Sequence, residues 1–312
     1  MVSDLETYLF DLRGYVLLKG ALSADEVSTL NATLDDIPRM EPGQWYGHVH
    51  AHSYGTKDGL NLQQIYEGGE PFEALIDHPS WIDHVKHFVG GEGSFDYHHG
   101  PLFIDENFAH FRQPGEAIGL HSGGYPPIHR NQFRYHGGRF MCGQVNVLLA
   151  LTDISTGDGG TMIIPGSHKS NFSHPHFDQY RMNSEGASVE GIEGAVEMHM
   201  EKGDAIVFVD GLSHGSAKRI NPGERRVVIY RYGPSWGNFR HGYQPSQELL
   251  ARLTPERRKI VQPLDLPRVR VHLIRIDHVF ADATEQHRRR RDGRRARPPR
   301  RRRANRRTDR RR

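Results

Sequence analysis

The strongest constraint on the fold is a series of short apolar runs, separated by turns, that begins near residue 94. The candidate strands are 101–104, 107–112, 144–151, 161–164, 195–200, 205–208 and 226–232. Turn-forming clusters such as Gly157-Asp158-Gly159-Gly160 and Asn221-Pro222-Gly223-Glu224 lie among them. Seven short strands with turn-forming residues between them indicate a β-sandwich or barrel rather than a sheet with alternating helices.

Helical patterns dominate the part of the chain before residue 93. Residues 3–37 predict two helices around a short strand, and the second helix begins with the capping box of Ser23 and Glu26. Residues 72–89 predict a further pair of helices with an apolar face. Residues 40–70 are rich in Gly, His and polar side chains, so we expect an ordered loop region there.

The C-terminal segment 287–312 contains 16 arginines and 2 aspartates and therefore carries 14 net positive charges. Because the whole chain has a formal charge of +3, the preceding residues carry −11. A low-complexity segment without apolar periodicity cannot bury enough surface to offset its ordering entropy, so we expect a disordered tail. The tail could bind polyanions, but no aromatic residue lies among its arginines. Nucleic acid is therefore not the expected partner.

Residues 1–286 are predicted to form one domain. Its parts are a helical region of about 1–92, a β-rich region of about 93–240 and a helical or extended region of 241–286. The single cysteine, Cys142, excludes an internal disulfide and favours a reducing compartment. The sequence has no secretory signal pattern and no run of roughly 18 apolar residues. We therefore expect a cytoplasmic protein without an obligate protein partner.

Two of the 21 histidines stand out because of their settings. His121 opens a glycine-rich loop, where the backbone can approach a metal closely. His214 follows the apolar run 205–209 and leads, through a turn, to the strand that begins at Arg225. Arg225 and Arg226 point to opposite faces of that strand. One of them can therefore face a barrel interior and bind a carboxylate, while the other is solvated.

With these residues in place, the sequence resembles the phytanoyl-CoA dioxygenase family of iron(II)/2-oxoglutarate oxygenases from about residue 5 to about residue 240. The opening Gly14-Tyr15-Val16-Leu17-Leu18-Lys19-Gly20 is similar to the first strand of that family. The stretch 159–168, which ends in Pro165-Gly166-Ser167-His168, resembles its Pro-Gly-Ser-His segment. Lys202-Gly203-Asp204-Ala205 resembles the turn before the strand of the distal histidine, and His214-Gly215-Ser216 is similar to the distal-histidine motif itself. Arg225 lies eleven residues beyond His214, where the family carries its 2-oxoglutarate arginine.

The resemblance implies a double-stranded β-helix, a jelly-roll or cupin-like core that is mainly β with flanking helices. It implies an enzyme in which His121 and His214 bind Fe(II), Arg225 binds the far carboxylate of 2-oxoglutarate, and O2 is the co-substrate. Neutral imidazoles with open coordination positions suit Fe(II) oxygen chemistry. His168 is expected to order a loop rather than to bind metal.

The departure from the family is at Gly123, where hydroxylating members carry Asp or Glu. In iron/2-oxoglutarate halogenases, Gly or Ala replaces this carboxylate and chloride takes the open position. Ferryl hydrogen abstraction then leaves a substrate radical that recombines with chlorine. The pattern His-x-Gly thus favours a halogenase, in which backbone N–H groups of Gly123 and Gly124 donate to the chloride.

Three alternatives to halogenation remain open. The protein could be a hydroxylase of the same fold, with water or another side chain in place of the carboxylate. Its site could be degenerate, or the protein could be a non-catalytic polyanion binder that uses the arginine-rich tail.

The insert 124–142 follows the proximal histidine directly and is rich in cations and imidazoles. We predict that His129, Arg130, Arg134 and Arg139 line the substrate mouth, where they would suit an anionic ligand. A solvated loop is the alternative. The expected substrate is a small anionic metabolite, and the resemblance to halogenases of nucleoside-antibiotic pathways favours a nucleotide. Such a role would belong to secondary metabolism.

Overall fold

The computed structural model describes most of the chain up to residue 262. The described residues are 1–53, 59–90, 100–115, 117–123, 128–182, 189–235, 237 and 243–262. The chain divides into two units, Met1–Asp265 and Leu266–Arg312. The second unit, which includes the predicted tail 287–312, lies outside the described residues, and the predicted region 241–286 is described only in part. The domain boundaries therefore stay predictions.

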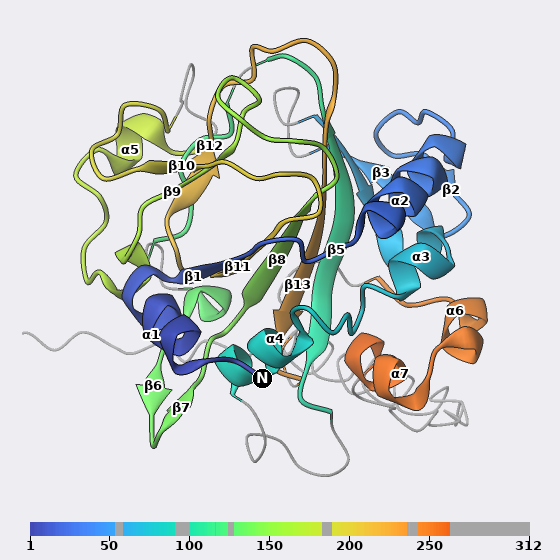
Figure 1. Ribbon diagram of the computed structural model, residues 1–312, viewed down its shortest axis with the longest axis horizontal. Coiled ribbons are helices and arrows are strands. Elements are labelled where there is room, and N and C mark those ends of the chain that lie inside the picture. The colour runs from blue at the N-terminus through green and yellow to red at the C-terminus, as the bar shows by residue number, and fades with distance from the viewer. Residues whose placement is uncertain are drawn as a thin grey trace, which may run out of the picture. The chain divides into compact units, whose positions relative to one another are not determined.

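An eight-stranded antiparallel sheet forms the centre of the first unit (Figure 1). The strand order is β1-β11-β8-β13-β5-β4-β3-β2. The strands are β1 Tyr15–Leu18, β2 Trp45–Tyr46, β3 Val49–His52, β4 Leu60–Gln63, β5 Phe103–Arg112, β8 Val145–Ala150, β11 Ala205–Val209 and β13 Arg225–Gly233. Apolar and β-branched residues fill its central strands, for example Val145, Val147 and Leu149, which are fully buried.

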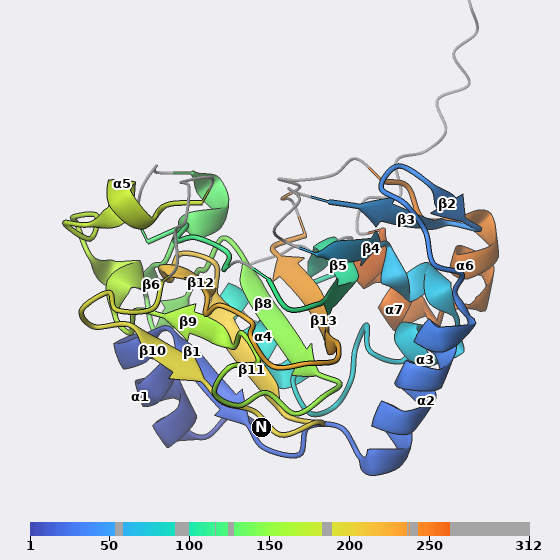
Figure 2. The same ribbon diagram turned by 90° about the horizontal axis from the view of Figure 1, so that it is seen from above.

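A second, three-stranded sheet lies opposite part of the first (Figure 2). It has the order β10-β9-β12, with β9 at Thr161–Ile163, β10 at Val196–Met198 and β12 at His214–Ser216. The strands β6 Tyr135–His136 and β7 Arg139–Phe140 form a separate hairpin. Two antiparallel sheets with helices around them confirm the predicted mainly β, jelly-roll architecture with flanking helices.

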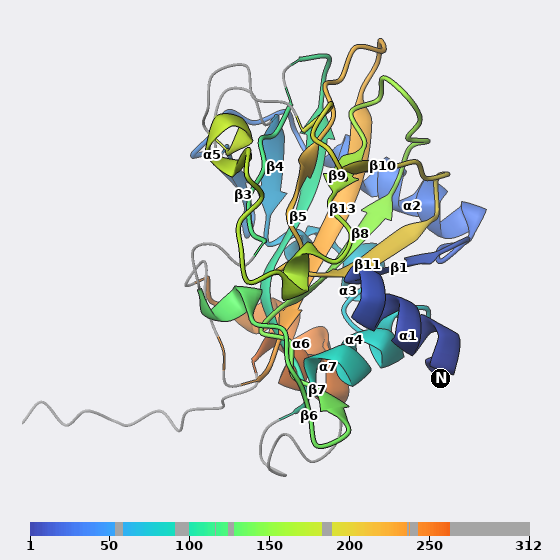
Figure 3. The same cartoon turned by 90° about the vertical axis from the view of Figure 1, so that its left-hand side faces the viewer.

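The helices lie around the large sheet. Most of them are short: α1 Asp4–Arg13, α2 Ala24–Asp36, α3 Glu70–Glu73, α4 Ile82–Val89, α5 Phe177–Tyr180, α6 Gln247–Arg252 and α7 Pro255–Val261. The predicted capping box of Ser23 and Glu26 is present and begins α2. Helices α4, α6 and α7 gather near one end of the large sheet (Figures 1 and 3). Among the described residues, no helix combines the length and the apolar composition that a bilayer crossing requires.

Strand β13 shows how one sheet separates the helices from the interior. Side chains alternate along the strand, so Tyr230 and Tyr232 point to the helical side. The Tyr230 hydroxyl donates to the carbonyl of Phe72 at 2.7 Å, and the Tyr232 hydroxyl donates to that of Ile76 at 3.0 Å. The odd-numbered residues from Arg225 to Arg231 therefore face the opposite side, which carries the candidate site.

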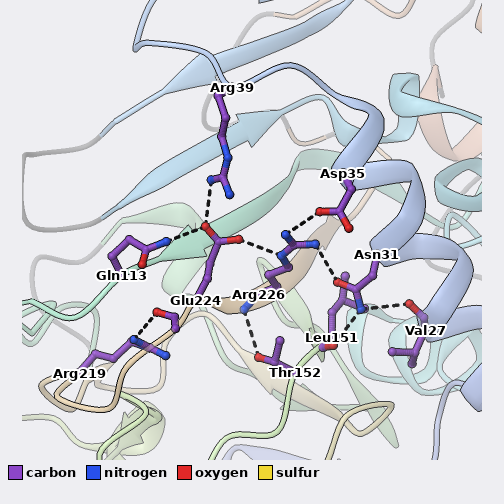
Figure 4. A network of polar contacts seen from close by, with 11 residues as sticks. Val27, Asn31, Asp35, Arg39, Gln113, Leu151, Thr152, Arg219, Glu224 and Arg226 are labelled. Atoms are coloured by element: carbon purple, nitrogen blue, oxygen red, sulfur yellow. Dashed lines mark hydrogen bonds and ion pairs between the residues drawn. The ribbon is translucent and has the colours of Figure 1, made fainter.

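Arg226 joins the outer face of β13 to helix α2, as Figure 4 shows. Its guanidinium binds Asp35 at 2.7 Å and Glu224 at 2.9 Å, and Glu224 also accepts from Arg39 at 2.9 Å. The same guanidinium lies 5.3 Å from the centre of the Phe111 ring. Of the two neighbouring arginines, Arg226 is thus the one held on the outer face of the sheet.

The structure differs from the sequence-based expectation in residues 40–70. The predicted loop contains β2, β3 and β4, which extend the large sheet beyond β5. Strand β4 carries polar side chains inward, since Asn61 and Gln63 are buried, and both residues of β2 are exposed. Because polar residues point to the interior, the hydropathy of the segment resembles that of a loop. For a similar reason, the candidate strands 101–104 and 107–112 are one continuous strand, since the intervening Asp105 and Glu106 are also buried.

Candidate active site

A cavity of about 170 Å³ lies between the two sheets. Strand β12 contributes His214 and Ser216 to its wall, and β13 contributes Arg225, Ile229 and Arg231. The large sheet adds Phe108 and His110 from β5 and Leu148 and Phe208 from β8 and β11, and His121 completes the polar end. Most of the cavity surface is apolar, and several polar side chains converge on it, as is typical of a small-molecule site.

His121 and His214 form a close pair at one end of this cavity. Their ring centroids are 4.0 Å apart, and their backbones are joined by two hydrogen bonds, of 2.9 Å and 3.1 Å. The Nδ1–H of His121 donates to the carbonyl of Gly119 at 3.0 Å, and that of His214 donates to Leu212 at 2.7 Å. An imidazole that donates through Nδ1 presents the lone pair of Nε2, as metal-binding histidines do.

The electrostatic setting of His121 also suits metal binding. Burial, together with the neighbouring His214, holds the pKa of His121 well below its usual value of 6.5. The imidazole is therefore neutral at pH 7 and has the lone pair that a metal ion needs.

No carboxylate joins the two histidines in the described part of the chain, where no group of three His, Cys, Asp or Glu side chains could hold a metal ion. Gly123 has a left-handed backbone with φ of +78°, and its N–H donates to the carbonyl of Gly211 at 2.9 Å. The expectation that this N–H donates to chloride is wrong, because the donor is already used within the fold. Gly124 lies outside the described residues.

Arg225 faces the same cavity and is 4% exposed. Its Nη1 donates to the carbonyl of Gly159, whereas its Nε has no hydrogen-bond partner among the described residues. Burial and the nearby Arg112 and Arg219 lower the pKa of Arg225 to about 9. A buried guanidinium that lines a cavity fits an anionic ligand such as a carboxylate.

The four predicted substrate residues are distributed unevenly. Arg130 lines the cavity, and its Nε binds the buried Asp210 at 2.9 Å. His129, Arg134 and Arg139 are exposed and lie outside the set of residues that line the cavity. Their part in substrate binding stays a prediction.

Several cavity residues were not predicted from the sequence. Arg231 binds the fully buried Glu106 at 2.7 Å, and His110 and Asn61 also line the cavity. The register that pairs β13 with β5, and β5 with β4, brings them together. The sequence does not give the register of a strand, so it does not show which polar residues of neighbouring strands will lie side by side.

His168 is buried away from the cavity lining, as its expected loop-ordering role requires. Its Nε2 donates to the carbonyl of Asp11 at 3.1 Å, and its ring lies edge-on to Phe133 with the centroids 4.4 Å apart. Burial lowers the pKa of His168 from 6.5 to about 4.

This shift predicts a pH dependence of stability. Between pH 6.5 and 4 the unfolded chain binds the proton and the folded chain does not, so stability falls as the pH falls through this window. We expect this group to remove about 2 kcal/mol of unfolding free energy between pH 7 and pH 5. His168→Gln keeps a donor for Asp11 and does not titrate, so it should show a correspondingly smaller loss. Urea unfolding at both pH values tests this, and equal losses in the two proteins would contradict it.

Solved structures of other proteins have a similar fold. HygX from Streptomyces hygroscopicus, solved with nickel and 2-oxoglutarate bound, superposes with a TM-score of 0.61 at 20% identity. The alignment covers 76% of this chain and 89% of HygX. The non-heme alpha ketoglutarate dependent epimerase SnoN from nogalamycin biosynthesis has a TM-score of 0.52 at 15% identity, covering 74% of this chain and 82% of SnoN. At these identities the likeness shows the jelly-roll fold.

Sequence comparison extends the likeness to the function. The dioxygenase cdmD of Talaromyces verruculosus is 24% identical over 265 residues, which is 80% of each chain. The profile of the phytanoyl-CoA dioxygenase (PhyH) family matches residues 10–227. This match includes both histidines and Arg225 and supports an Fe(II)/2-oxoglutarate-dependent dioxygenase type of function, without specifying halogenation. The chain belongs to the phytanoyl-CoA dioxygenase family.

Proposed function

We propose that this protein is an Fe(II)/2-oxoglutarate-dependent halogenase that chlorinates an unactivated C–H bond of a small metabolite. His121 and His214 would hold the iron through Nε2, and Arg225 would bind the far carboxylate of 2-oxoglutarate. The observation that carries the proposal is the paired histidines, with both Nδ1 atoms anchored, in a part of the chain where no carboxylate completes a three-residue metal site. An exogenous ligand, which we propose to be chloride, would then complete the metal site.

Some residues of the cavity would bind 2-oxoglutarate, and others would exclude water. Bound iron would supply oxidation chemistry with O2, in which the co-substrate 2-oxoglutarate becomes succinate and CO2. Arg225 orients 2-oxoglutarate through a charged hydrogen bond in a buried setting, where such bonds are strongest. Leu148, Phe208 and Ile229 form an apolar wall that keeps water from the reacting C–H bond.

The substrate is proposed to be a small anionic metabolite, with a nucleotide favoured. Support comes from Arg130 at the cavity and from Phe108 and Phe208, whose rings can pack against a planar group. Arg130 and Arg231 each bind a buried carboxylate, so an anionic substrate would share them with Asp210 and Glu106.

Hydroxylation is the second candidate, and a specific observation favours it. The side chain of Ser213 occupies the space beside Gly123 in which a side chain at that position would begin. If no chloride has room near the histidines, water completes the metal site and the same residues support hydroxylation.

Product analysis tests the proposal. The protein is incubated with Fe(II), 2-oxoglutarate, O2 and chloride, together with a panel of nucleotides and other small anionic metabolites. We expect succinate release that depends on one substrate and a product with the chlorine isotope pattern. A product that gains oxygen and never chlorine would replace halogenation by hydroxylation. Absence of succinate with iron-loaded protein and the whole panel would contradict both.

A further inference from the structure

We propose that Ser213 determines, together with Gly123, that the candidate metal site has no protein carboxylate. This inference rests on the proposed function, in which His121 and His214 bind iron. A Cβ atom built on Gly123 would lie 1.7 Å from the Oγ of Ser213 and 2.9 Å from its Cβ. Real Cβ atoms do not approach other heavy atoms so closely, so a side chain at position 123 and the serine at position 213 exclude one another.

The backbone around Ser213 gives it little room to move away. Ser213 is 2% exposed, its N–H donates to Ser167 Oγ at 2.7 Å, and its carbonyl accepts from Ile164 at 2.9 Å. The N–H of Gly123 is bonded to Gly211, two residues before Ser213. A rotation of the Ser213 side chain would move Oγ, but its Cβ would remain at 2.9 Å.

The local conformation adds a second, separate obstacle. Ser122 and Gly123 are both left-handed, with φ of +62° and +78°. Any side chain at position 123 would be strained in this conformation, although Asp and Asn tolerate it better than other residues do. The strain depends on position 123 alone, whereas the steric conflict depends on both positions. The two effects can therefore be separated by changing Ser213.

Substitution of Ser213 by smaller residues reduces the steric conflict in two steps. Ser213→Ala removes Oγ and leaves Cβ at 2.9 Å, while Ser213→Gly removes both atoms and leaves Cα at 3.4 Å, an ordinary contact distance. Restoring the family's carboxylate should therefore require Gly123→Asp together with Ser213→Gly. Gly123→Asp alone cannot build a third ligand without displacing the turn that carries His214.

The first experiment measures the coupling in iron-free protein. Gly123→Ala is made in the wild-type, Ser213→Ala and Ser213→Gly backgrounds, and each thermal midpoint is compared with that of its own background. We expect the loss to be largest in the wild-type background and to shrink by about 5 °C in the Ser213→Gly background. Equal losses in all three backgrounds would overturn the proposal, and so would a Gly123→Ala protein that fails to fold in every background.

The second experiment measures Fe(II) affinity by anaerobic calorimetry. We expect Gly123→Asp with Ser213→Gly to bind iron about 10-fold more tightly than Ser213→Gly alone, because a carboxylate adds a third ligand. Gly123→Asn with Ser213→Gly is the matched control, since it has the same shape and no charge. Tighter binding by Gly123→Asp without a change at Ser213, or no gain in the double variant, would overturn the proposal. Failure of the wild-type protein to bind iron would instead refute the proposed function, and the first experiment would still decide the coupling.

Discussion

His214→Ala should abolish tight Fe(II) binding, with a loss of affinity of about 100-fold or more. The described residues offer the metal two imidazoles and no carboxylate, so removal of one of them halves the protein ligand set. The change should also abolish 2-oxoglutarate turnover. Anaerobic calorimetry with Fe(II) measures the first effect, and succinate release measures the second.

His110→Gln is the matched control for this change. His110 lines the same cavity from strand β5, but it is not part of the histidine pair. We expect His110→Gln to bind Fe(II) within a factor of about three of the wild-type affinity, which corresponds to well under 1 kcal/mol. If His214→Ala binds iron as wild type does, or if His110→Gln loses binding equally, the assignment of the metal ligands is wrong.

Arg225→Gln should weaken 2-oxoglutarate binding by about 100-fold, because a buried charge-assisted hydrogen bond to a carboxylate contributes about 3 kcal/mol. The guanidinium is 4% exposed and faces the cavity, so water does not replace the lost interaction. Calorimetric titration of 2-oxoglutarate into the metal-loaded protein, without O2, measures the effect. The thermal stabilisation that 2-oxoglutarate gives to the wild-type protein should also disappear.

The neighbouring residue supplies the control for Arg225. Arg226→Gln changes the same side chain on the same strand, but on the outer face, where it breaks contacts with Asp35 and Glu224 (Figure 4). We expect this variant to have a lower thermal midpoint and an unchanged dissociation constant for 2-oxoglutarate. A loss of 2-oxoglutarate binding in Arg226→Gln similar to that in Arg225→Gln would show that the effect is indirect.

The histidine pair and the arginine were predictable because their signals are local. His121 and His214 each lie beside a turn or an apolar run, and the strand that begins at Arg225 alternates faces over nine residues. Alternation showed that only one of Arg225 and Arg226 could point inward. The order of these motifs along the chain also indicated the family, which the match over residues 10–227 confirms.

Strands β2 to β4 were missed for a physical reason. β2 has only two residues, both exposed, and β4 buries the polar Asn61 and Gln63, so hydropathy does not distinguish these short strands from a loop. The ion pairs of Arg130 with Asp210 and of Arg231 with Glu106 could not be predicted from the sequence either. Arg130 and Asp210 lie outside the strands and 80 positions apart, and Arg231 and Glu106 lie on β13 and β5, 125 positions apart, so neither contact has a local signal in the sequence.

The sequence by itself determined the types of residue available to the site: two histidines, an arginine and a glycine where a carboxylate was expected. The resemblance to the family implied the roles of these residues, and strand alternation, which acts over a few residues, allowed only one of Arg225 and Arg226 to face inward. Only the tertiary structure decided that Gly123 lies against Ser213, since these residues are 90 positions apart and meet through the contact between the loop of His121 and the strand of His214. The sequence shows that position 123 has no side chain, whereas only the packing of the folded chain places Ser213 Oγ in that space.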